Sequence, residues 1–427
     1  MKRVAWLALS AGILLGCGEE SPTDVGGPLL PAGSVRTFEV VLDAADFMGV
    51  DTSFSGYTRI QGSGFQVVAD GFEGTLDAHT LARFDIPTII AVTDTAGVVR
   101  TDSTPVFVGG RIVARVDTLR SNMPGTVRFR LTRIEEEWDP ATATWTLRVD
   151  SSGSQLAWAQ PGAAGGSEIA AIDWTAAGSD SLIIPIDSAT VAEWSDTTTT
   201  ARGARLSIVT DGTRVRFADL VLRVDARSTI RPDTIFTTTV RPPDPTFLFD
   251  PSLPESSADL VLSGAPGWRT FVEFREDLGL RMVPCPSSPG CRVRLDQVAI
   301  TFAGLLLEPQ ASPPGFVPQD SLLLEARAVY ASERAPLARS PLGVSVGVMT
   351  RQIAPDRFRD VTGAEAIELP VTGFVSGLVN SDTTFAPPSP WVALLPYLEG
   401  VDFGVAAFRP LPRLRLVLTI ASELQLR

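Results

Sequence analysis

The sequence contains one histidine, His79, and one lysine, Lys2, so two side chains that commonly act as general bases or nucleophiles are almost missing. It also lacks a glycine-rich phosphate loop, a His-x-x-x-His pair and an EF-hand loop. His79 stands at the entry to an apolar segment, where a surface or structural histidine is more common than a general base. We therefore predict a protein that is not an enzyme, with no catalytic residue, no metal ligand and no cofactor.

Basic residues are scarce relative to acidic ones, 36 against 49, which gives a formal net charge of −13. An acidic surface argues against nucleic acid as a partner and against peripheral binding to anionic lipid headgroups. Carboxylates keep two alternatives open. Glycoside hydrolysis needs only two of them, and Glu135, Glu136, Glu137 and Asp139 flank Trp138, so a polysaccharide-active enzyme or its accessory module is one alternative. A calcium-dependent adhesin is the other, although no Ca²⁺ ligand loop can be named.

Long apolar runs are also missing, and the run from Val4 to Leu15 is shorter than the roughly 20 residues of a membrane-spanning helix. It follows Lys2 and Arg3 and ends in small residues, which is typical of a signal peptide over residues 1–16. The ending Leu14-Leu15-Gly16-Cys17 resembles the lipobox of bacterial lipoproteins. This resemblance implies that Cys17 becomes the lipidated first residue of the mature chain; an ordinary signal peptide with a chance cysteine is the alternative.

Lipidation at Cys17 would anchor the chain to a membrane without a transmembrane helix. Gly18 resembles the residue found at that position in lipoproteins of the outer membrane, so we predict an exported protein that is lipid-anchored to the cell envelope, at the outer membrane. Residues 18–34 are rich in Gly, Pro, Ser and acid and have no periodic pattern. With the lipidated cysteine they form a predicted flexible tether, 17–34, whose reach is roughly 20 to 25 Å by random-coil scaling.

Only two other cysteines, Cys285 and Cys291, are present, and Pro, Ser and Gly separate them. In an oxidising compartment this spacing predicts one local structural disulfide. Metal binding would require a histidine or acidic cluster beside them, and redox activity would favour a Cys-x-x-Cys spacing. The sequence has neither feature.

Alternation of apolar and polar residues with period 2 dominates the rest of the chain and predicts an all-β protein built from antiparallel β-sandwiches. Residues 188–195 are the clearest helical candidate. Proline concentrates in residues 241–257, which we interpret as a linker between a first sandwich, 35–240, and a second, 258–427. The segments that carry the strand pattern are Arg36–Leu42, Phe65–Ala69, Arg111–Leu119, Thr126–Ile134, Ala204–Val209 and Thr213–Val224.

Several short segments of the first half are weakly similar to segments of the second half and occur in the same order, which favours a tandem duplication. Leu81–Phe84 corresponds to Phe271–Phe274, and Leu182–Trp194 corresponds to Ile367–Leu378. Together with residues 128–139, the first-half segments resemble the DNRLRE-type domain, a jelly-roll sandwich related in shape to carbohydrate-binding modules. The resemblance covers about residues 75–225 and implies adhesion or contact with a cell wall or polysaccharide, with no catalytic residue to transfer.

Tryptophan is the enriched residue of the first half. We expect Trp138 and Trp194, which end alternating segments, to lie in a core. Trp158 and Trp174 are flanked by Ala, Gly, Gln and Ser, so we expect them to be exposed and name them as candidate ligand-binding residues that could stack on sugar rings. The sequence therefore predicts a non-catalytic envelope lipoprotein that binds a glycan, a cell wall or envelope proteins, or has a structural role.

Overall fold

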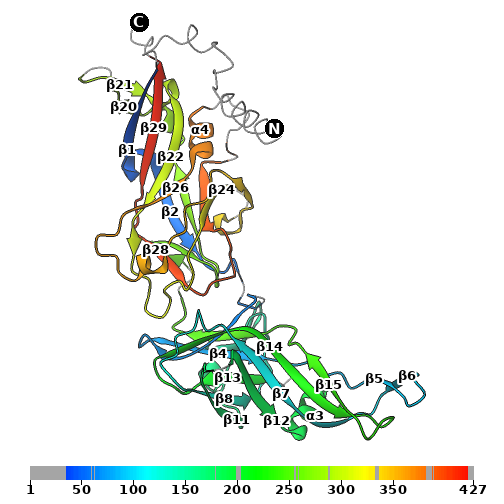
Figure 1. Cartoon of the computed structure of the whole chain (residues 1–427). Coiled ribbons are helices and arrows are strands. Elements are labelled where there is room, and N and C mark those ends of the chain that lie inside the picture. Colours follow the sequence, from blue (N-terminus) through cyan, green and yellow to red (C-terminus); the bar gives the residue numbers. More distant parts are fainter. Residues whose placement is uncertain are drawn as a thin grey trace, which may run out of the picture.

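The computed structural model describes residues 35–58, 60–61, 63–177, 179–198, 203–253, 256–257, 259–286, 289–331, 336–380, 387 and 389–421. The predicted signal peptide, Cys17 and the tether lie outside the described residues. Figure 1 shows two lobes, one above the other. We call residues 63–250 the lower lobe and residues 35–58 with 256–421 the upper lobe. Every described strand pair in both lobes is antiparallel, which confirms the predicted all-β fold class.

The lower lobe is built on one ten-stranded sheet. Eight strands follow the order β11-β8-β13-β4-β3-β14-β7-β12, while β15 pairs with β14 and β16 pairs with β4. The strands are β3 (Gln66–Phe72), β4 (Leu76–Ala82), β7 (Val106–Val116), β8 (Val127–Arg133), β11 (Glu168–Trp174), β12 (Ser181–Ile186), β13 (Ala204–Ile208), β14 (Thr213–Arg227), β15 (Ile235–Val240) and β16 (Thr246–Asp250). Two small hairpins are not part of this sheet: β5 (Ile90–Thr93) with β6 (Val99–Asp102), and β9 (Leu147–Ser151) with β10 (Ser154–Ala157).

The ten-stranded sheet curls until its two end strands, β11 and β12, approach each other. The indole Nε1 of Trp174 on β11 donates a hydrogen bond to the carbonyl of Ser181 on β12, at 3.1 Å. The sheet is therefore a nearly closed barrel. Its interior holds a continuous apolar core that includes Phe84, Phe129 and Trp194, and the Phe84 and Trp194 rings stack at 5.7 Å.

Helix α3 (Ser188–Ser195) lies where the sequence predicts a helix. Asp187 caps its N-terminus by accepting a hydrogen bond from the Thr190 backbone N–H at 2.7 Å. Val191 and Trp194, three residues apart on one helix face, are fully buried in the barrel core. This short helix therefore covers one end of the barrel. The lower lobe also contains the 3₁₀ turn η1 (Pro161–Ala163).

The upper lobe consists of three smaller sheets and one hairpin. The first sheet has the order β1-β29-β22-β26, the second β17-β2-β19-β27-β24-β25, and the third β18-β28-β23. Their bounds are β1 (Val35–Leu42), β2 (Met48–Phe54), β17 (Ser256–Ser257), β18 (Leu260–Ser263), β19 (Arg269–Phe274), β22 (Ala299–Leu307), β23 (Pro309–Gln310), β24 (Leu324–Val329), β25 (Leu342–Ser345), β26 (Ile367–Pro370), β27 (Trp391–Pro396), β28 (Val405–Phe408) and β29 (Arg413–Ala421). The hairpin joins β20 (Met282–Pro284) to β21 (Arg292–Arg294).

Helical segments of the upper lobe are short. They are α2 (Ala44–Phe47), α4 (Thr372–Val379), η2 (Leu278–Leu280), η3 (Leu295–Gln297), η4 (Leu337–Arg339) and η5 (Pro355–Phe358). Helix α4 follows strand β26 as α3 follows β12, so the sequence echo between Leu182–Trp194 and Ile367–Leu378 corresponds to the same strand–helix unit in both lobes. The wider duplication stays a prediction, since the order of the strands differs between the lobes.

Strand pairing does not follow the predicted boundaries 35–240 and 258–427. Strand β1 pairs with the C-terminal strand β29, from Val35 opposite Ala421 to Leu42 opposite Leu414, and β2 pairs with β19. The lower lobe is therefore inserted in the sequence between strands β2 and β17 of the upper lobe. The predicted linker 241–257 is also structured, because it contains β16, in which Phe247 and Leu248 are buried.

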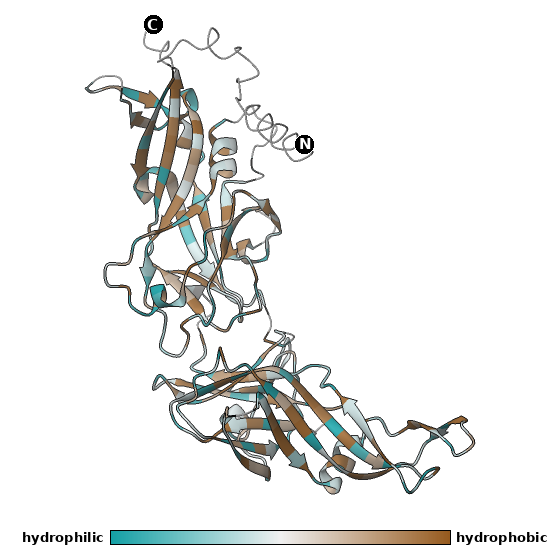
Figure 2. Ribbon diagram, in the orientation of Figure 1, coloured by the Kyte–Doolittle hydropathy of each residue, from teal (hydrophilic) through white to brown (hydrophobic). Residues whose placement is uncertain are grey.

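Figure 2 shows apolar positions alternating with polar ones along the strands of both lobes, as the period-2 pattern predicts. The upper lobe has its own core, which brings β1 and β29 together with β22 and α4. A third cluster spans the junction of the lobes. In it Phe65, Phe72 and Phe247 of the lower lobe pack with Trp268, Phe316 and Phe403 of the upper lobe.

Candidate functional site

The two tryptophans predicted to be exposed are buried. The exposed fraction is 5% for Trp158 and 9% for Trp174, so the prediction that these rings are available for sugar stacking is wrong. Trp174 closes the barrel, as described above, and Trp158 Nε1 donates to the Thr144 carbonyl at 2.9 Å. The predicted burial of Trp138 and Trp194 is confirmed, with exposed fractions of 3% and 1%.

A long excursion between β8 and β11 explains the burial of Trp158. Residues 134–163 fold over the outer face of the barrel, where Ile134, Trp138 and Trp158 pack on Leu81 of β4 and Leu248 of β16. Gly162 allows this close coverage, because a Cβ there would lie 2.8 Å from both His79 Nδ1 and the Trp145 ring. Polar neighbours in the sequence therefore did not indicate an exposed ring.

The acidic run beside Trp138 holds this excursion in place. Glu135 accepts hydrogen bonds from the backbone N–H and the hydroxyl of Ser167, which keeps the pKa of its carboxyl below the usual range. Glu136 accepts from the backbone N–H of Ala159 at 3.1 Å and lies 3.6 Å from Arg148 Nε. Both carboxylates thus bind groups of the chain itself.

His79 lies beneath the same excursion. Its Nδ1 is 2.7 Å from the carbonyl of Gly162, and its ring packs on Trp145 with the centroids 4.7 Å apart. Burial, reinforced by the positive charge of Arg205, lowers its pKa to about 4. The imidazole is therefore neutral at pH 7 and positions the loop at Gly162.

Two arginines of β14 cross the junction between the lobes. The Arg214 guanidinium lies 4.3 Å above the Phe72 ring and donates to the carbonyl of Gly315 at 3.0 Å. The Arg216 guanidinium lies 4.0 Å above Phe65 and donates to the Val401 carbonyl at 2.8 Å. Both carbonyls belong to the upper lobe, while both rings belong to the lower lobe.

Further polar contacts surround these arginines. Arg120 of the lower lobe contacts Asp320 of the upper lobe at 2.5 Å and Asp117 at 2.8 Å, and Gln319 Nε2 donates to the Arg120 carbonyl at 2.7 Å. Asp402 lies 4.0 Å from Arg216. Burial raises the pKa of Asp402 and lowers that of Arg216.

A cavity of about 570 Å³ opens beside this network. Its walls carry two arginines and two aspartates of the network, together with Ser321, Gln352 and the apolar side chains of Leu322, Leu398 and Val401. The charges of Arg120, Arg216, Asp320 and Asp402 compensate one another, so the cavity offers a ligand no uncompensated ion. This geometry is that of a polar seam between two packed bodies.

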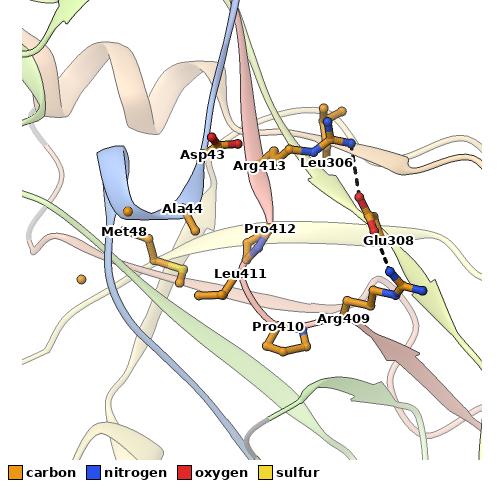
Figure 3. A pocket seen from close by; sticks show the side chains of 12 residues that line it. Asp43, Ala44, Met48, Leu306, Glu308, Arg409, Pro410, Leu411, Pro412 and Arg413 are labelled. Carbon is orange, nitrogen blue, oxygen red and sulfur yellow. Dashed lines mark hydrogen bonds and ion pairs between the residues drawn. The ribbon is translucent and has the colours of Figure 1, made fainter.

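A second cavity, of about 450 Å³, lies on the upper lobe between the β1–β2 connection and the loop from β28 to β29 (Figure 3). Glu308 lies between Arg413, at 3.3 Å, and Arg409, at 3.6 Å. Leu411 stands between two prolines with φ of +63°, and the side chains of Met48 and Leu411 form apolar parts of the lining. One carboxylate, Glu308, is thus shared by two guanidinium groups, and Asp43 also lines the cavity.

Cys285 and Cys291 are joined as predicted. Their sulfur atoms lie within bonding distance and their Cα atoms are 5.2 Å apart, at the end of the β20–β21 hairpin. One face of the hairpin packs into the upper-lobe core through Val283 and Val293. The disulfide therefore closes a hairpin that is already fixed to the core at its base.

Among the described residues, no group of three or more His, Cys, Asp or Glu side chains is arranged to hold a metal ion. Within the same part of the chain, no helix is both long enough and apolar enough to cross a bilayer.

Comparisons with known proteins found no match: no family model, no curated protein and no solved structure is similar to this chain. The lipobox and the resemblance to the DNRLRE-type domain therefore stay predictions from the sequence.

Proposed function

We propose that this chain is an exported, non-catalytic envelope protein that is anchored by lipid at Cys17 and holds its lower lobe away from the membrane. Its role is to contact polysaccharide or other envelope proteins, or to serve as a structural element. Outer-membrane placement is part of the proposal and rests on Gly18.

The point at which the chain enters the fold carries the proposal. Val35, the first residue of β1, pairs with Ala421 at the end of the upper lobe that Figure 1 draws farthest from the lower lobe. At the other end of this lobe, Ser55 and Gly56 line a cavity of about 220 Å³ together with Trp145 of the lower lobe. A lipid attached through residues 18–34 thus supports an arrangement with the upper lobe near the membrane and the lower lobe beyond it.

The junction between the lobes supports the same role. Arginines stacked on phenylalanines, hydrogen bonds to Gly315 and Val401, and a shared aromatic cluster fix one lobe on the other. Two lobes fixed in this way hold the far end of the protein at a defined distance from the anchor, whereas a flexible linker would not.

A non-catalytic role is supported by the contacts of the reactive side chains, which hydrogen bond to other groups of the protein. His79 is neutral and hydrogen bonded to Gly162, Glu135 accepts from Ser167, and Glu136 accepts from Ala159. The polysaccharide-active alternative needs two carboxylates free to meet a substrate. Because Trp158 and Trp174 are buried, a glycan contact would have to use other side chains.

Metabolic labelling with an alkyne fatty acid tests the anchor. The native protein is expected to carry the label and to fractionate with membranes, and Cys17→Ser is expected to lose the label because no other residue replaces the thioether. The double variant Cys285→Ser/Cys291→Ser is the matched control and should keep the label. Equal labelling of the native protein and Cys17→Ser would overturn the proposal.

A further inference from the structure

The disulfide-closed hairpin lies at the end of the upper lobe where the chain enters. In the first sheet, Ala299 of β22 is opposite Thr419 of β29, and Thr419 is opposite Thr37 of β1. The turn η3, which closes the hairpin, ends only two residues before Ala299. The base of the hairpin is therefore beside the first residues of β1, as Figure 1 also shows.

The hairpin segment has a charge opposite to that of the whole protein. From Leu278 to Leu295 it contains three arginines, Arg281, Arg292 and Arg294, and no acidic residue, whereas the chain carries 49 acidic and 36 basic residues. Glu276 and Asp277 precede this segment and Asp296 follows it, so its attraction for anions depends on which arginine lacks an acidic partner.

The outward face of the hairpin combines these cations with exposed apolar side chains. Met282 is opposite Arg294 and Pro284 is opposite Arg292, while Val283 between them is buried in the core. The exposed fraction is 44% for Met282 and 59% for Leu280, just before β20.

The three arginines differ in how far their charge is compensated. Arg294 is paired with Asp296, and Arg281 lies 3.7 Å from Asp46. Arg292 donates to the Met282 carbonyl at 2.9 Å and makes no ion pair within the part of the chain that the structure describes. Arg292 therefore carries the uncompensated charge of this face.

We propose that Leu280, Met282, Pro284 and Arg292, which we call the hairpin face, rest on the anionic phospholipid surface of the bilayer that holds Cys17. This inference depends on the proposed lipid anchor. The predicted tether of residues 18–34 would reach roughly 20 to 25 Å by random-coil scaling, so an anchored Cys17 would keep the entry point of β1, and the hairpin beside it, near the headgroups. There the apolar side chains enter the interface and the guanidinium meets phosphate.

This contact reconciles the acidic composition with a membrane surface. A net negative protein is repelled as a whole by anionic lipid, yet surface charges act over only about 8 to 10 Å at physiological salt. In the proposed orientation Arg292 lies within that distance of the lipid phosphates and attracts them, whereas the carboxylates of the lower lobe lie too far away to repel them. The hairpin face thus selects one orientation of the anchored body.

Methionine oxidation measures the contact in the native protein. The purified lipidated protein is placed in phosphatidylcholine vesicles with or without phosphatidylglycerol, or in detergent, treated with hydrogen peroxide and analysed by mass spectrometry. Met349 is a matched internal control, since its exposed fraction is 39% and its neighbour Thr350 bonds to Leu324 near the junction end. We expect Met282 to oxidise several-fold more slowly in vesicles with phosphatidylglycerol than in detergent, and Met349 to oxidise equally fast in both.

Variants and salt separate this proposal from the anchor itself. Arg292→Glu should abolish the protection of Met282 from oxidation. Arg100→Glu, on the far hairpin of the lower lobe, should leave this protection unchanged. High salt should reduce the protection in the native protein. A protein that floats with vesicles while Met282 oxidises as fast as in detergent would overturn the hairpin face and leave the anchor intact. A protein that carries no lipid and does not float would overturn both.

Discussion

The two lobes are assembled from the chain in different ways. The lower lobe is one uninterrupted segment, residues 63–250, that closes on itself as a barrel. The upper lobe takes its strands from both ends of the described chain, and β1 lies against β29 across more than 370 residues of sequence. Each lobe nevertheless has its own apolar core.

This difference shows where each lobe is vulnerable. In the barrel only β3–β4 and β14–β15 are ladders between consecutive strands, and its longest contact, between Asp77 and Asp250, closes a loop less than half as long as the one between β1 and β29. The upper lobe must first bring its two ends together, and closing a longer loop costs more chain entropy. We therefore expect the N-terminal strand to matter to the upper lobe alone.

Removal of residues 1–42 tests this expectation and should have the largest effect. Loss of β1 leaves one edge of β29 without a partner and uncovers the part of the core that Phe38, Val40 and Leu42 cover. We therefore expect the upper lobe to lose its fold, because this loss lowers the free energy of unfolding by more than about 5 kcal/mol. Hydrogen exchange should then show unprotected amides in the upper lobe and protected amides in the barrel.

The matched control replaces Thr95 and Ala96, which are exposed at the turn of the projecting β5–β6 hairpin, by glycine. It should leave the exchange of both lobes nearly native. If loss of β1 unfolds the barrel as well, the lobes form a single cooperative unit and the comparison fails.

Buried tryptophans of the barrel give the second effect. Trp194→Ala and Trp174→Ala should each lower the free energy of unfolding by about 3 to 5 kcal/mol, because each removes a large buried side chain and leaves a cavity. Urea unfolding followed by circular dichroism measures this loss, with the exposed Val99→Ala as the control. An unchanged transition in Trp174→Ala would show that the seam between β11 and β12 is not stabilised by this ring.

The smallest effect concerns pH and is confined to the barrel. His79 has a pKa of about 4 in the fold and about 6.5 when unfolded, so the unfolded chain binds more protons between these values. The stability that neutral His79 contributes is therefore present above pH 6.5 and lost as the pH falls toward 4, by about 2 kcal/mol. His79→Gln, compared with the native protein in urea at pH 7 and pH 4.5, should remove this part of the pH dependence. Equal pH slopes for the two proteins would contradict it.

Periodicity predicted the strands well because each strand buries one face, and it predicted α3 from residues 188–195. The period-2 pattern failed to predict which side chains are exposed where a second layer of the protein covers the outer face of the sheet. Arg214 and Arg216 alternate with Val215 and Phe217 as on any solvent-exposed strand, yet the upper lobe covers them. Trp158 was misjudged for the same reason, since polar neighbours do not reveal that a loop folds back on the sheet. The pairing of β1 with β29 has no local signal at all, because it joins the two ends of the chain.

The position of β1 and β29 has a mechanical consequence. Since Val35 and Ala421 are opposite each other, tension applied between the two ends of the described chain would open the β1–β29 ladder one pair at a time, like a zipper. The barrel is inserted between β2 and β17, so it would carry no load until the upper lobe had opened. A pull on the anchor against the C-terminus would thus leave the far lobe folded.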